Sequence, residues 1–323
     1  MLQGLSPKDI GRLALIVQEE TGNQVLEKNH SMLESRLRSR MLKVGKSNAE
    51  AYWEYFKLNE AEERQALKSL MTTHYTFFFR EYSHFEALEN WIQSNLGFLK
   101  DRFLKTKTPL RVWSAACSKG QEVYSLAMFL NTILLQKHGI DFMIYGTDID
   151  HESVAIGKNG VYPISEVNTI PQHFLNGNWK RGTGHIKDFA AIHPKLKVKT
   201  YFDVLNLFEL KKWRPELGFD VIFCRNVFIY FSEDSVKKAA LDLASRLIDG
   251  GLFVSGVSEP LRFKEWQMSS PSPSCYIKPS KNTAQAHNEP AAFTQAAPTA
   301  VASQLNTPKE KRYSVLCVDD SMT

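Results

Sequence analysis

The stretch RVWSAACSKGQE, residues 111–122, decides the fold. It begins as a short apolar run, passes through small residues and leads into a helical pattern at Glu122. Such a strand, turn and helix is typical of a parallel α/β sheet, in which ligands bind beyond the carboxyl ends of the strands. Gly120 is the only glycine of the turn, which therefore lacks the GxGxxG spacing of dinucleotide sites. This argues against NAD as the ligand.

The same pattern repeats on the C-terminal side of this stretch. Apolar runs separated by helical segments predict a mostly parallel sheet, and hence an α/β fold class. We expect strands at 110–115, 142–147, 198–203, 219–224 and 252–257, with crossover helices at 122–138 and 233–248. The less regular segment 162–199 contains the turn KRGTG at 180–184, which predicts a small antiparallel insertion.

The residues before this region read as an all-helical domain. SPKD at 6–9 opens a first helix, and the pairs Ser31 with Glu34 and Ser47 with Glu50 have the spacing of capping boxes. One apolar face is then formed by four residues, Leu33, Leu37, Met41 and Val44. The boundary to the α/β domain is expected near residue 88.

A basic stripe lies on the opposite side of the same predicted helix. Its members are Arg36, Arg40 and Lys43, with Arg38 and Lys46 nearby. The stripe could contact an acidic partner surface, or it could be no more than a solvated face.

Composition places the chain among multidomain proteins without a membrane span. A length of 323 residues exceeds the size at which single cores stop growing, about 250 residues, and 43% hydrophobic residues with 23% charged is ordinary. No apolar run approaches a membrane span, and the N-terminus lacks the pattern of a signal peptide, so we expect a cytoplasmic protein. Neither the four cysteines nor the nine histidines show metal-ligand spacing, so no metal site is expected.

Polar residues at strand ends indicate a nucleoside site. In GTDID, 146–150, Asp148 could accept hydrogen bonds from both ribose hydroxyls of an adenosine, whereas Asp150 better suits the N-cap of the next helix. Arg80, Arg225, Asn226 and Tyr230 stand among apolar residues and need hydrogen-bond partners, which a ligand could supply; the neighbouring phenylalanines are read as core.

Long motifs carry a resemblance to a known family. They are TTHYTFFFRE (72–81), RVWSAACSKGQEVYS (111–125), GTDID (146–150), the step Asn206-Leu207, FDVIFCRNVFIYF (219–231) and GGLFVSGVSEP (250–260). In this order they resemble the chemotaxis receptor methyltransferases, the CheR family, over roughly residues 5–280. The tail from 312 to 323 separately resembles the start of a response-regulator receiver domain.

The resemblance implies the architecture. It consists of an N-terminal all-helical domain (1–88), a Rossmann-like methyltransferase domain (89–280) with an inserted antiparallel β-subdomain at about 162–199, a flexible linker (281–311) and a truncated receiver start (312–323).

The resemblance also implies the site. Arg80 and Tyr230 would be catalytic, and the cofactor S-adenosylmethionine would be bound by Thr76, Arg80, Ala116, Glu122, Asp148, Asn206, Leu207, Arg225 and Asn226. Within that set, Asp148 would hold the ribose, Asn206 and Leu207 would flank the adenine, and Ala116 and Glu122 would border the methionine. The sequence departs from the family pattern at His74, where asparagine is common, and at Gln121, which leaves one carboxylate where two are usual.

The implied activity is transfer of a methyl group to receptor glutamates, with S-adenosylhomocysteine as product. The expected partners are the helical bundle of a chemoreceptor, a peptide at the receptor's C-terminus held by the β-subdomain, and a signalling kinase acting through the receiver; nucleic acid and membrane insertion are not expected. Two alternatives remain open: a methyltransferase with another acceptor, and a non-catalytic adaptor that senses adenosylmethionine.

Overall fold

The computed structural model describes residues 5–22, 30–71, 75–214 and 218–280. His74, the predicted linker 281–311 and the predicted receiver start lie outside these ranges. None of the described helices combines the length and apolar character needed to span a membrane.

The N-terminal part is all-helical, as predicted. Its helices are α1 (Pro7–Thr21), α2 (His30–Lys43), α3 (Ala49–Leu58) and α4 (Glu60–Met71). Leu33, Leu37 and Met41 are buried in their common core, and Val44 packs against it. The predicted apolar face of α2 is therefore confirmed.

The helix starts were predicted with mixed success. Ser6 caps α1, and Asp9 completes the capping box. The two other predicted caps are wrong: α2 already begins at His30, so Ser31 lies inside it, and the N-cap of α3 is Asn48, whose side chain accepts from the Ala51 amide. For α3 the N-cap lies one position after the predicted Ser47.

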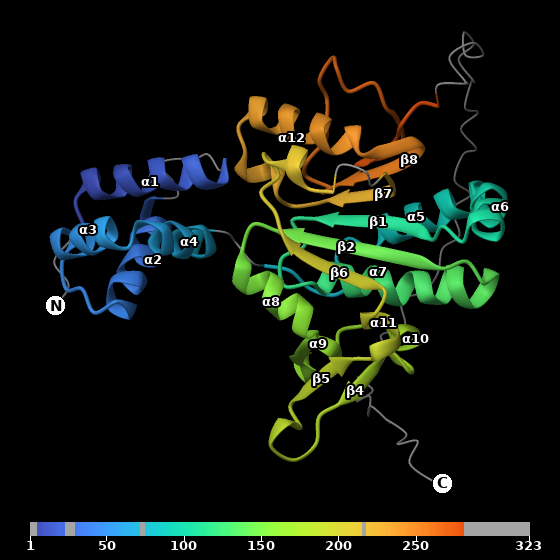
Figure 1. The fold of residues 1–323 in the computed structure, drawn as a ribbon, viewed down its shortest axis with the longest axis horizontal. Coiled ribbons are helices and arrows are strands. Elements are labelled where there is room, and N and C mark those ends of the chain that lie inside the picture. The colour runs from blue at the N-terminus through green and yellow to red at the C-terminus, as the bar shows by residue number, and fades with distance from the viewer. Residues whose placement is uncertain (1–4, 23–29, 72–74, 215–217, 281–323) are drawn as a thin grey trace, which may run out of the picture. The chain divides into compact units, whose positions relative to one another are not determined.

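A seven-stranded sheet forms the centre of the second part (Figure 1). Its strand order is β6-β2-β1-β7-β8-β10-β9. The strands are β1 (Leu110–Ala115), β2 (Phe142–Asp148), β6 (Thr200–Val204), β7 (Phe219–Cys224), β8 (Leu247–Ser255), β9 (Ser269–Ser272) and β10 (Cys275–Ile277). The first five in the order pair in parallel, and β10 and β9 pair antiparallel at one edge.

The strand order reverses between β1 and β7. From β1 the chain continues outward to β2 and β6, whereas β7 pairs with the other side of β1 and leads on to β8. In sheets of this kind the loops at the carboxyl ends diverge at the reversal and leave a crevice for a ligand. The fold therefore places a site beyond Ala115 and Cys224.

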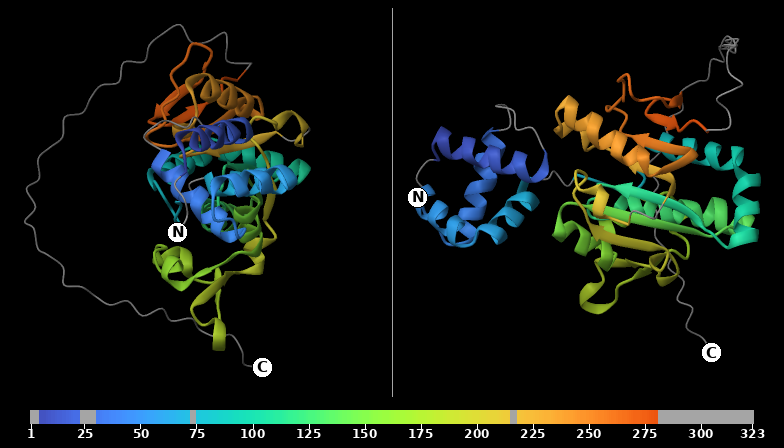
Figure 2. Two further views of the ribbon diagram at one scale, coloured as in Figure 1. Left: turned by 90° about the vertical axis from the view of Figure 1, so that its left-hand side faces the viewer. Right: turned by 45° about the horizontal axis from the view of Figure 1, so that its top comes forward.

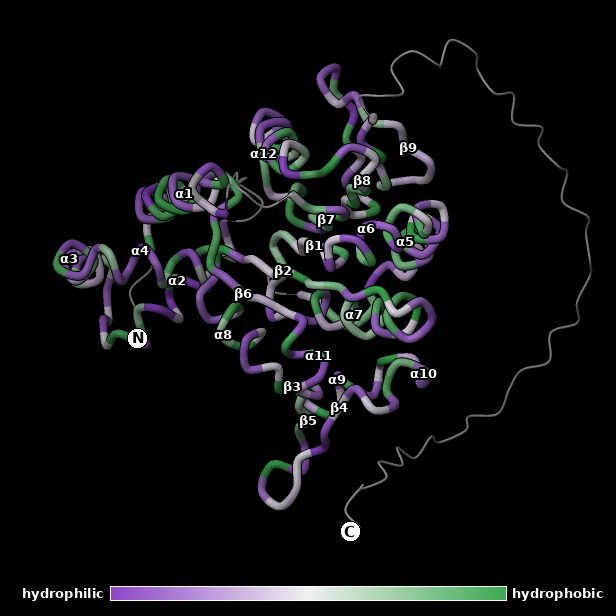
Figure 3. Tube along the Cα trace, turned by 45° about the vertical axis from the view of Figure 1, so that its right-hand side comes forward, coloured by the Kyte–Doolittle hydropathy of each residue, from purple (hydrophilic) through white to green (hydrophobic). Residues whose placement is uncertain are grey.

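Helices cover both faces of the sheet, which explains why its central strands are apolar throughout. On one face α5 (Ser83–Ser94) and α7 (Gln121–Leu130) pack against Val112 and Phe223, and on the other α12 (Glu233–Ser245) packs against Trp113 and Ile222. The two layers are visible on either side of the sheet in the turned views (Figure 2). Figure 3 shows α7 as mainly hydrophobic, as expected for a helix that is buried nearly all round.

The remaining helices are short or lie at the ends of the sheet. They are α6 (Leu96–Thr106), α8 (His151–Asn159), α9 (Ile164–Val167), α10 (Gln172–Leu175) and α11 (Pro194–Lys197). The predicted insertion is confirmed as a separate antiparallel sheet with the order β3-β5-β4, formed by β3 (Val161–Pro163), β5 (Phe189–Ile192) and β4 (Trp179–Arg181).

Candidate functional site

Two adjoining cavities lie at the carboxyl ends of the parallel strands. The first encloses about 660 Å³ and the second about 490 Å³, both with open solvent included, which is within the usual range for ligand sites. The first is lined by Ala116, Asp148, Asn206, Leu207, Tyr230 and others, and the second by Thr76, Arg80, Glu122 and others. Ala116, Ser118, Arg225 and Asn226 belong to both walls, so the cavities form one continuous site.

All ten residues predicted for the site lie in these walls. Thr76 and Arg80 lie between α4 and α5, and the other eight end or follow the strands β1, β2, β6 and β7. The structure therefore brings residues from separate sequence motifs together in one site. The role of each residue is a prediction.

Asp148 connects the ends of two neighbouring strands. It is the last residue of β2, and its Oδ2 accepts from the Ser118 amide at 2.7 Å in the turn after β1. Its Oδ1 accepts from the Asp150 amide at 2.9 Å. Asp150 in turn caps α8, as predicted, by accepting from the amides of Glu152 and Ser153. Asp148 therefore joins the turn after β1 to the start of α8.

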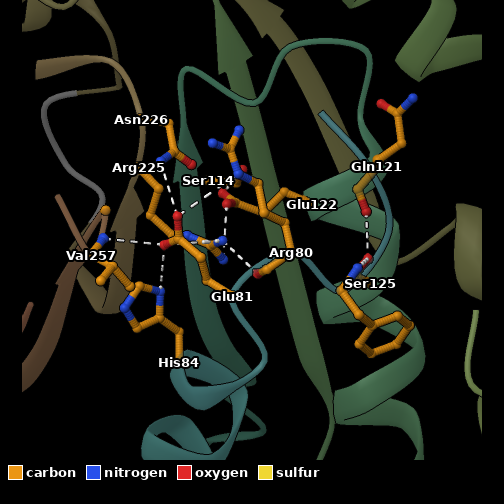
Figure 4. A network of polar contacts seen from close by, with 12 residues as sticks. Arg80, Glu81, His84, Ser114, Gln121, Glu122, Ser125, Arg225, Asn226 and Val257 are labelled. Carbon is orange, nitrogen blue, oxygen red and sulfur yellow. Dashed lines mark hydrogen bonds and ion pairs between the residues drawn. The ribbon is translucent and has the colours of Figure 1, made fainter. Parts of the chain in front are cut away.

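A buried arginine organises the second cavity (Figure 4). The Arg225 side chain is 2% exposed, and its Nη2 donates to the carbonyl of Arg80 at 2.5 Å. Its Nη1 lies 3.4 Å from Glu122 Oε2, and its Nη2 lies 3.6 Å from Glu81 Oε2. Two carboxylates thus balance one buried guanidinium, as burial of a charge requires.

The two carboxylates have opposite pKa shifts. Burial raises the pKa of Glu122, although Arg225 and the 2.6 Å hydrogen bond from Ser114 oppose the rise. Burial would raise the pKa of Glu81 as well, but a hydrogen bond from Asn226 and the charge of Arg225 outweigh it and lower that pKa. Glu81 is therefore the firmer anion of the pair.

Arg80 stands at the wall of the second cavity with part of its guanidinium free of hydrogen bonds to described residues. Its Nη1 donates to the Tyr75 carbonyl at 3.0 Å, and the guanidinium lies over the rings of Tyr75 and Phe77. The segment itself is fixed to α7, because the Phe79 amide donates to Ser125 Oγ at 2.9 Å (Figure 4). A guanidinium has five N–H donors, so this arrangement leaves Arg80 able to bind a carboxylate.

The far end of the first cavity is more apolar. Leu205 and Leu207 are buried there beside Asn206, whose Oδ1 accepts from the Phe208 amide at 3.0 Å and whose Nδ2 donates to the Glu20 carbonyl at 3.2 Å. The Asn206 side chain is thus already bonded within the protein, which gives it a structural task besides any contact with a ligand.

Backbone strain concentrates at the site. Eight non-glycine residues of the described chain have positive φ, and five of them belong to the cavity walls or contact the wall residues directly: Phe79, Glu81, Ala116, Ser118 and Asn226. Such conformations cost of order 1 kcal/mol or more each and persist where the surroundings hold them. The cavity is therefore shaped by the fold before any ligand binds.

Three buried groups near the site were missed by the sequence analysis. Glu259 accepts from the Asn226 backbone amide, Glu81 accepts from the Asn226 side chain, and His84, at 1% exposure, lies with its Nδ1 3.3 Å from Glu81 Oε2. Burial, together with the charge of Arg225, lowers the pKa of His84 to about 4. The quoted motifs contained Glu81 and Glu259, but their contacts join residues far apart in the sequence and leave no local pattern.

The basic stripe on α2 is smaller than predicted. Arg40 is paired with Glu63, which is fully buried, and Arg38 is paired with Glu34 at 2.7 Å. Arg36 is half-buried, and Lys43 remains exposed. The prediction that Arg40 lies on the exposed side is therefore wrong, because its guanidinium forms an ion pair with the buried Glu63 carboxylate on α4.

A cavity at the reversal point of a parallel sheet, with an acidic residue ending the second strand, is where doubly wound folds bind nucleoside ligands. Residues 74–275 match the SAM binding domain of CheR methyltransferases, and residues 8–72 match their all-alpha domain. The chain belongs to the CheR methyltransferase family.

Two chemotaxis methyltransferases are similar in sequence to most of the chain. It is 33% identical to the chemotaxis protein methyltransferase 2 of Pseudomonas aeruginosa over 243 residues, which is 74% of this chain and 81% of that protein. It is 30% identical to the chemotaxis protein methyltransferase of Salmonella typhimurium over 256 residues, 79% of this chain and 84% of that protein. The family and the fold class are thus confirmed.

Proposed function

We propose that this chain transfers the methyl group of S-adenosylmethionine to glutamate side chains of methyl-accepting chemotaxis receptors, which gives glutamate 5-O-methyl esters. The observation that carries the proposal is the position of Arg80 in the wall of the second cavity, next to the first cavity with Asp148. A guanidinium is suited to a carboxylate acceptor, whereas a neutral nitrogen acceptor gains little from it.

The residues present fit adenosylmethionine. Two buried polar atoms of the cavity walls, Ser118 Oγ and Arg225 Nε, have no hydrogen-bond partner among the described residues. Asp148 can accept from ribose hydroxyls, the Leu205–Leu207 end can take the adenine, and the Glu122 carboxylate can meet the amino group of the methionine part. The cavity walls therefore offer a complementary group to each part of the molecule.

When bound, adenosylmethionine supplies a methyl group on a positively charged sulfur. The charges of sulfonium and acceptor carboxylate are both lost during transfer, so the protein need not stabilise new charge. Its main task is to hold the acceptor oxygen in line with the methyl group in a site that excludes water.

Arg80 performs the positioning in this proposal. Its remaining N–H groups would fix the acceptor carboxylate in a bidentate pair, while the Tyr75 carbonyl holds one Nη in place. Tyr230, in the wall of the first cavity, would add a further hydrogen bond. No general base is needed, because a glutamate is ionised at neutral pH.

The partners follow from the acceptor. We propose a receptor's cytoplasmic helical bundle as substrate, with the β3-β5-β4 sheet as a site for a peptide at the receptor's C-terminus. We also propose a cytoplasmic location, domain boundaries near 88 and 280, and a signalling kinase acting through a receiver domain that begins near 312. The last of these rests on the sequence of the tail alone.

The test is methyl transfer from radiolabelled adenosylmethionine to receptor-containing membranes. We expect label on the receptor that is released as methanol in mild base, because carboxyl methyl esters hydrolyse there and N-methyl groups do not. Base-stable label would favour another acceptor. Binding of the nucleoside without any transfer would favour the sensing adaptor.

A further inference from the structure

Asn226 is held by two carboxylates at once. It follows the carboxyl end of β7, lies in the walls of both cavities and has a φ of 58°. Its backbone amide donates to Glu259 Oε2 at 2.6 Å, and its side-chain Nδ2 donates to Glu81 Oε1 at 3.0 Å. A left-handed conformation that asparagine adopts only at some cost is thus fixed from two sides.

Glu259 is the more deeply buried of the two. It is 5% exposed, and its Oε2 also accepts from the Gly256 amide at 2.9 Å, while its Oε1 accepts from the Ile229 amide at 3.0 Å. Burial raises its pKa, and these backbone donors oppose the rise. The carboxylate therefore joins the end of β8 to both ends of the loop that carries Asn226 and Tyr230.

The close approach depends on Gly256. A Cβ at this position would lie 2.5 Å from Glu259 Oε2 and 3.0 Å from the Asn226 amide nitrogen. Both distances are shorter than ordinary carbon contacts, so a side chain at 256 would displace the carboxylate. The backbone at the end of β8 is thereby adapted to receive Glu259.

Glu81 holds Asn226 from a different part of the chain (Figure 4). Its Oε2 accepts from the Val257 amide at 3.2 Å and lies 3.6 Å from Arg225 Nη2. It therefore ties the segment containing Arg80 to the ends of β7 and β8. Neither Glu81 nor Glu259 is among the residues described as lining the two cavities, so each acts through others.

We propose that Glu81 and Glu259 are positioning residues for cofactor binding, which together hold the loop 225–230 in the conformation that binds adenosylmethionine. The inference rests on the cofactor and not on the identity of the acceptor. Glu259→Gln keeps the shape of the side chain, but its amide group turns two hydrogens toward backbone amides that also donate. At least one of these amides then loses its acceptor, and the loop shifts to relieve the conflict.

The experiment compares Glu259→Gln with Asp220→Asn. Asp220 is a fair control because it is 2% exposed, lies on β7, the strand that leads into the loop 225–230, and accepts from the Arg111 amide at 2.8 Å and from Arg102 Nη1 at 2.6 Å, outside both cavities. The dissociation constant of S-adenosylhomocysteine is measured by calorimetry on the full chain, below the melting temperature of each variant. Methyl transfer gives KM for adenosylmethionine and kcat.

We expect Glu259→Gln to raise the dissociation constant of S-adenosylhomocysteine roughly tenfold or more and to lower kcat, because an unsatisfied buried amide near the site is costly. Asp220→Asn should lower the melting temperature and leave the dissociation constant within about twofold. The Glu81 side chain is only 18% exposed, and Glu81→Gln should weaken binding of the nucleoside as well. If Glu259→Gln fails to fold, Glu81→Gln alone tests the proposal.

The proposal is overturned if folded Glu259→Gln or Glu81→Gln binds the nucleoside with wild-type affinity, or if Asp220→Asn weakens it equally. The binding measurement contains no acceptor. A failure to methylate receptors would therefore contradict the proposed function without touching this inference.

Discussion

Arg225 donates a 2.5 Å hydrogen bond from Nη2 to the backbone carbonyl of Arg80, 145 residues earlier in the chain. The contact fixes the main chain of the residue proposed to bind the acceptor, using a side chain that lines both cavities. In the proposed function, one buried side chain is thus shared by the cofactor cavity and the residue that binds the acceptor. Substitutions of Arg225 would therefore affect both halves of the site, whereas substitutions of Arg80 and Asp148 address one half each.

Arg80→Ala removes the proposed carboxylate ligand and should leave the cofactor site intact. We expect turnover to fall about 100-fold or more, since loss of positioning is costly in a displacement reaction. S-Adenosylhomocysteine should bind within a few-fold of wild type, as calorimetry can measure. Wild-type turnover would remove Arg80 from the mechanism.

Asp148→Ala and Asp150→Ala form a matched pair, because both carboxylates lie at the end of β2 and are buried. The first should weaken the binding of S-adenosylhomocysteine at least tenfold through loss of the ribose contact, since hydrogen bonds to a charged group contribute about 1.5–3 kcal/mol. The second removes the N-cap of α8 and should cost about 1 kcal/mol of stability with little change in affinity. Equal losses of affinity would contradict the assignment of the ribose to Asp148.

His84 should make the protein sensitive to acid. Its pKa is lowered to about 4 in the folded state from an ordinary 6.5, so between these values the unfolded chain binds more protons. This stabilising contribution is fully present above pH 6.5 and is lost as the pH falls toward 4, by about 3 kcal/mol in all. Urea unfolding at a series of pH values should show a flatter dependence for His84→Gln than for wild type between pH 6.5 and 4.5. Parallel curves would count against a buried neutral histidine.

Lys43→Glu tests the remaining basic stripe. If α2 meets a glutamate-rich receptor surface, receptor methylation should slow severalfold at low salt and recover at high salt, because screening removes the effect of exposed charges. Lys57→Glu on α3 changes the net charge equally and is exposed as well. The same slowing in both variants, or a loss independent of salt, would contradict the docking role. Arg40→Glu is unsuitable for this test, because it would place a second carboxylate beside buried Glu63 and destabilise the fold.

The sequence predicted those parts of the fold that local pattern determines. The strands at 110–115 and 219–224 were predicted with the observed bounds, because each is buried on both faces and ends at a change to polar residues. The strand expected at 252–257 instead runs from Leu247 to Ser255 and passes through Gly250 and Gly251. The helix expected at 122–138 continues past Leu130 only as the π-helical turn Asn131–Gln136, a change that no local pattern announces.

The site was predictable to the extent that its residues stand in recognisable motifs. Asp148 could be inferred from its place at a strand end, and Arg80 and Tyr230 mainly from the family resemblance. Glu81 and Glu259 could not be assigned, because their hydrogen bonds, from the side chain and the backbone amide of Asn226, form only when the folded chain brings distant segments together.

Gly256 and Glu259 are linked in a way that bears on how such a chain can change over generations. A methyl group at 256 would lie 2.5 Å from the carboxylate at 259, so alanine there requires that the acid moves out of its hydrogen bonds or is replaced. A homologue with a larger residue at 256 should therefore lack the acid at 259, whereas a homologue without the acid can keep the glycine.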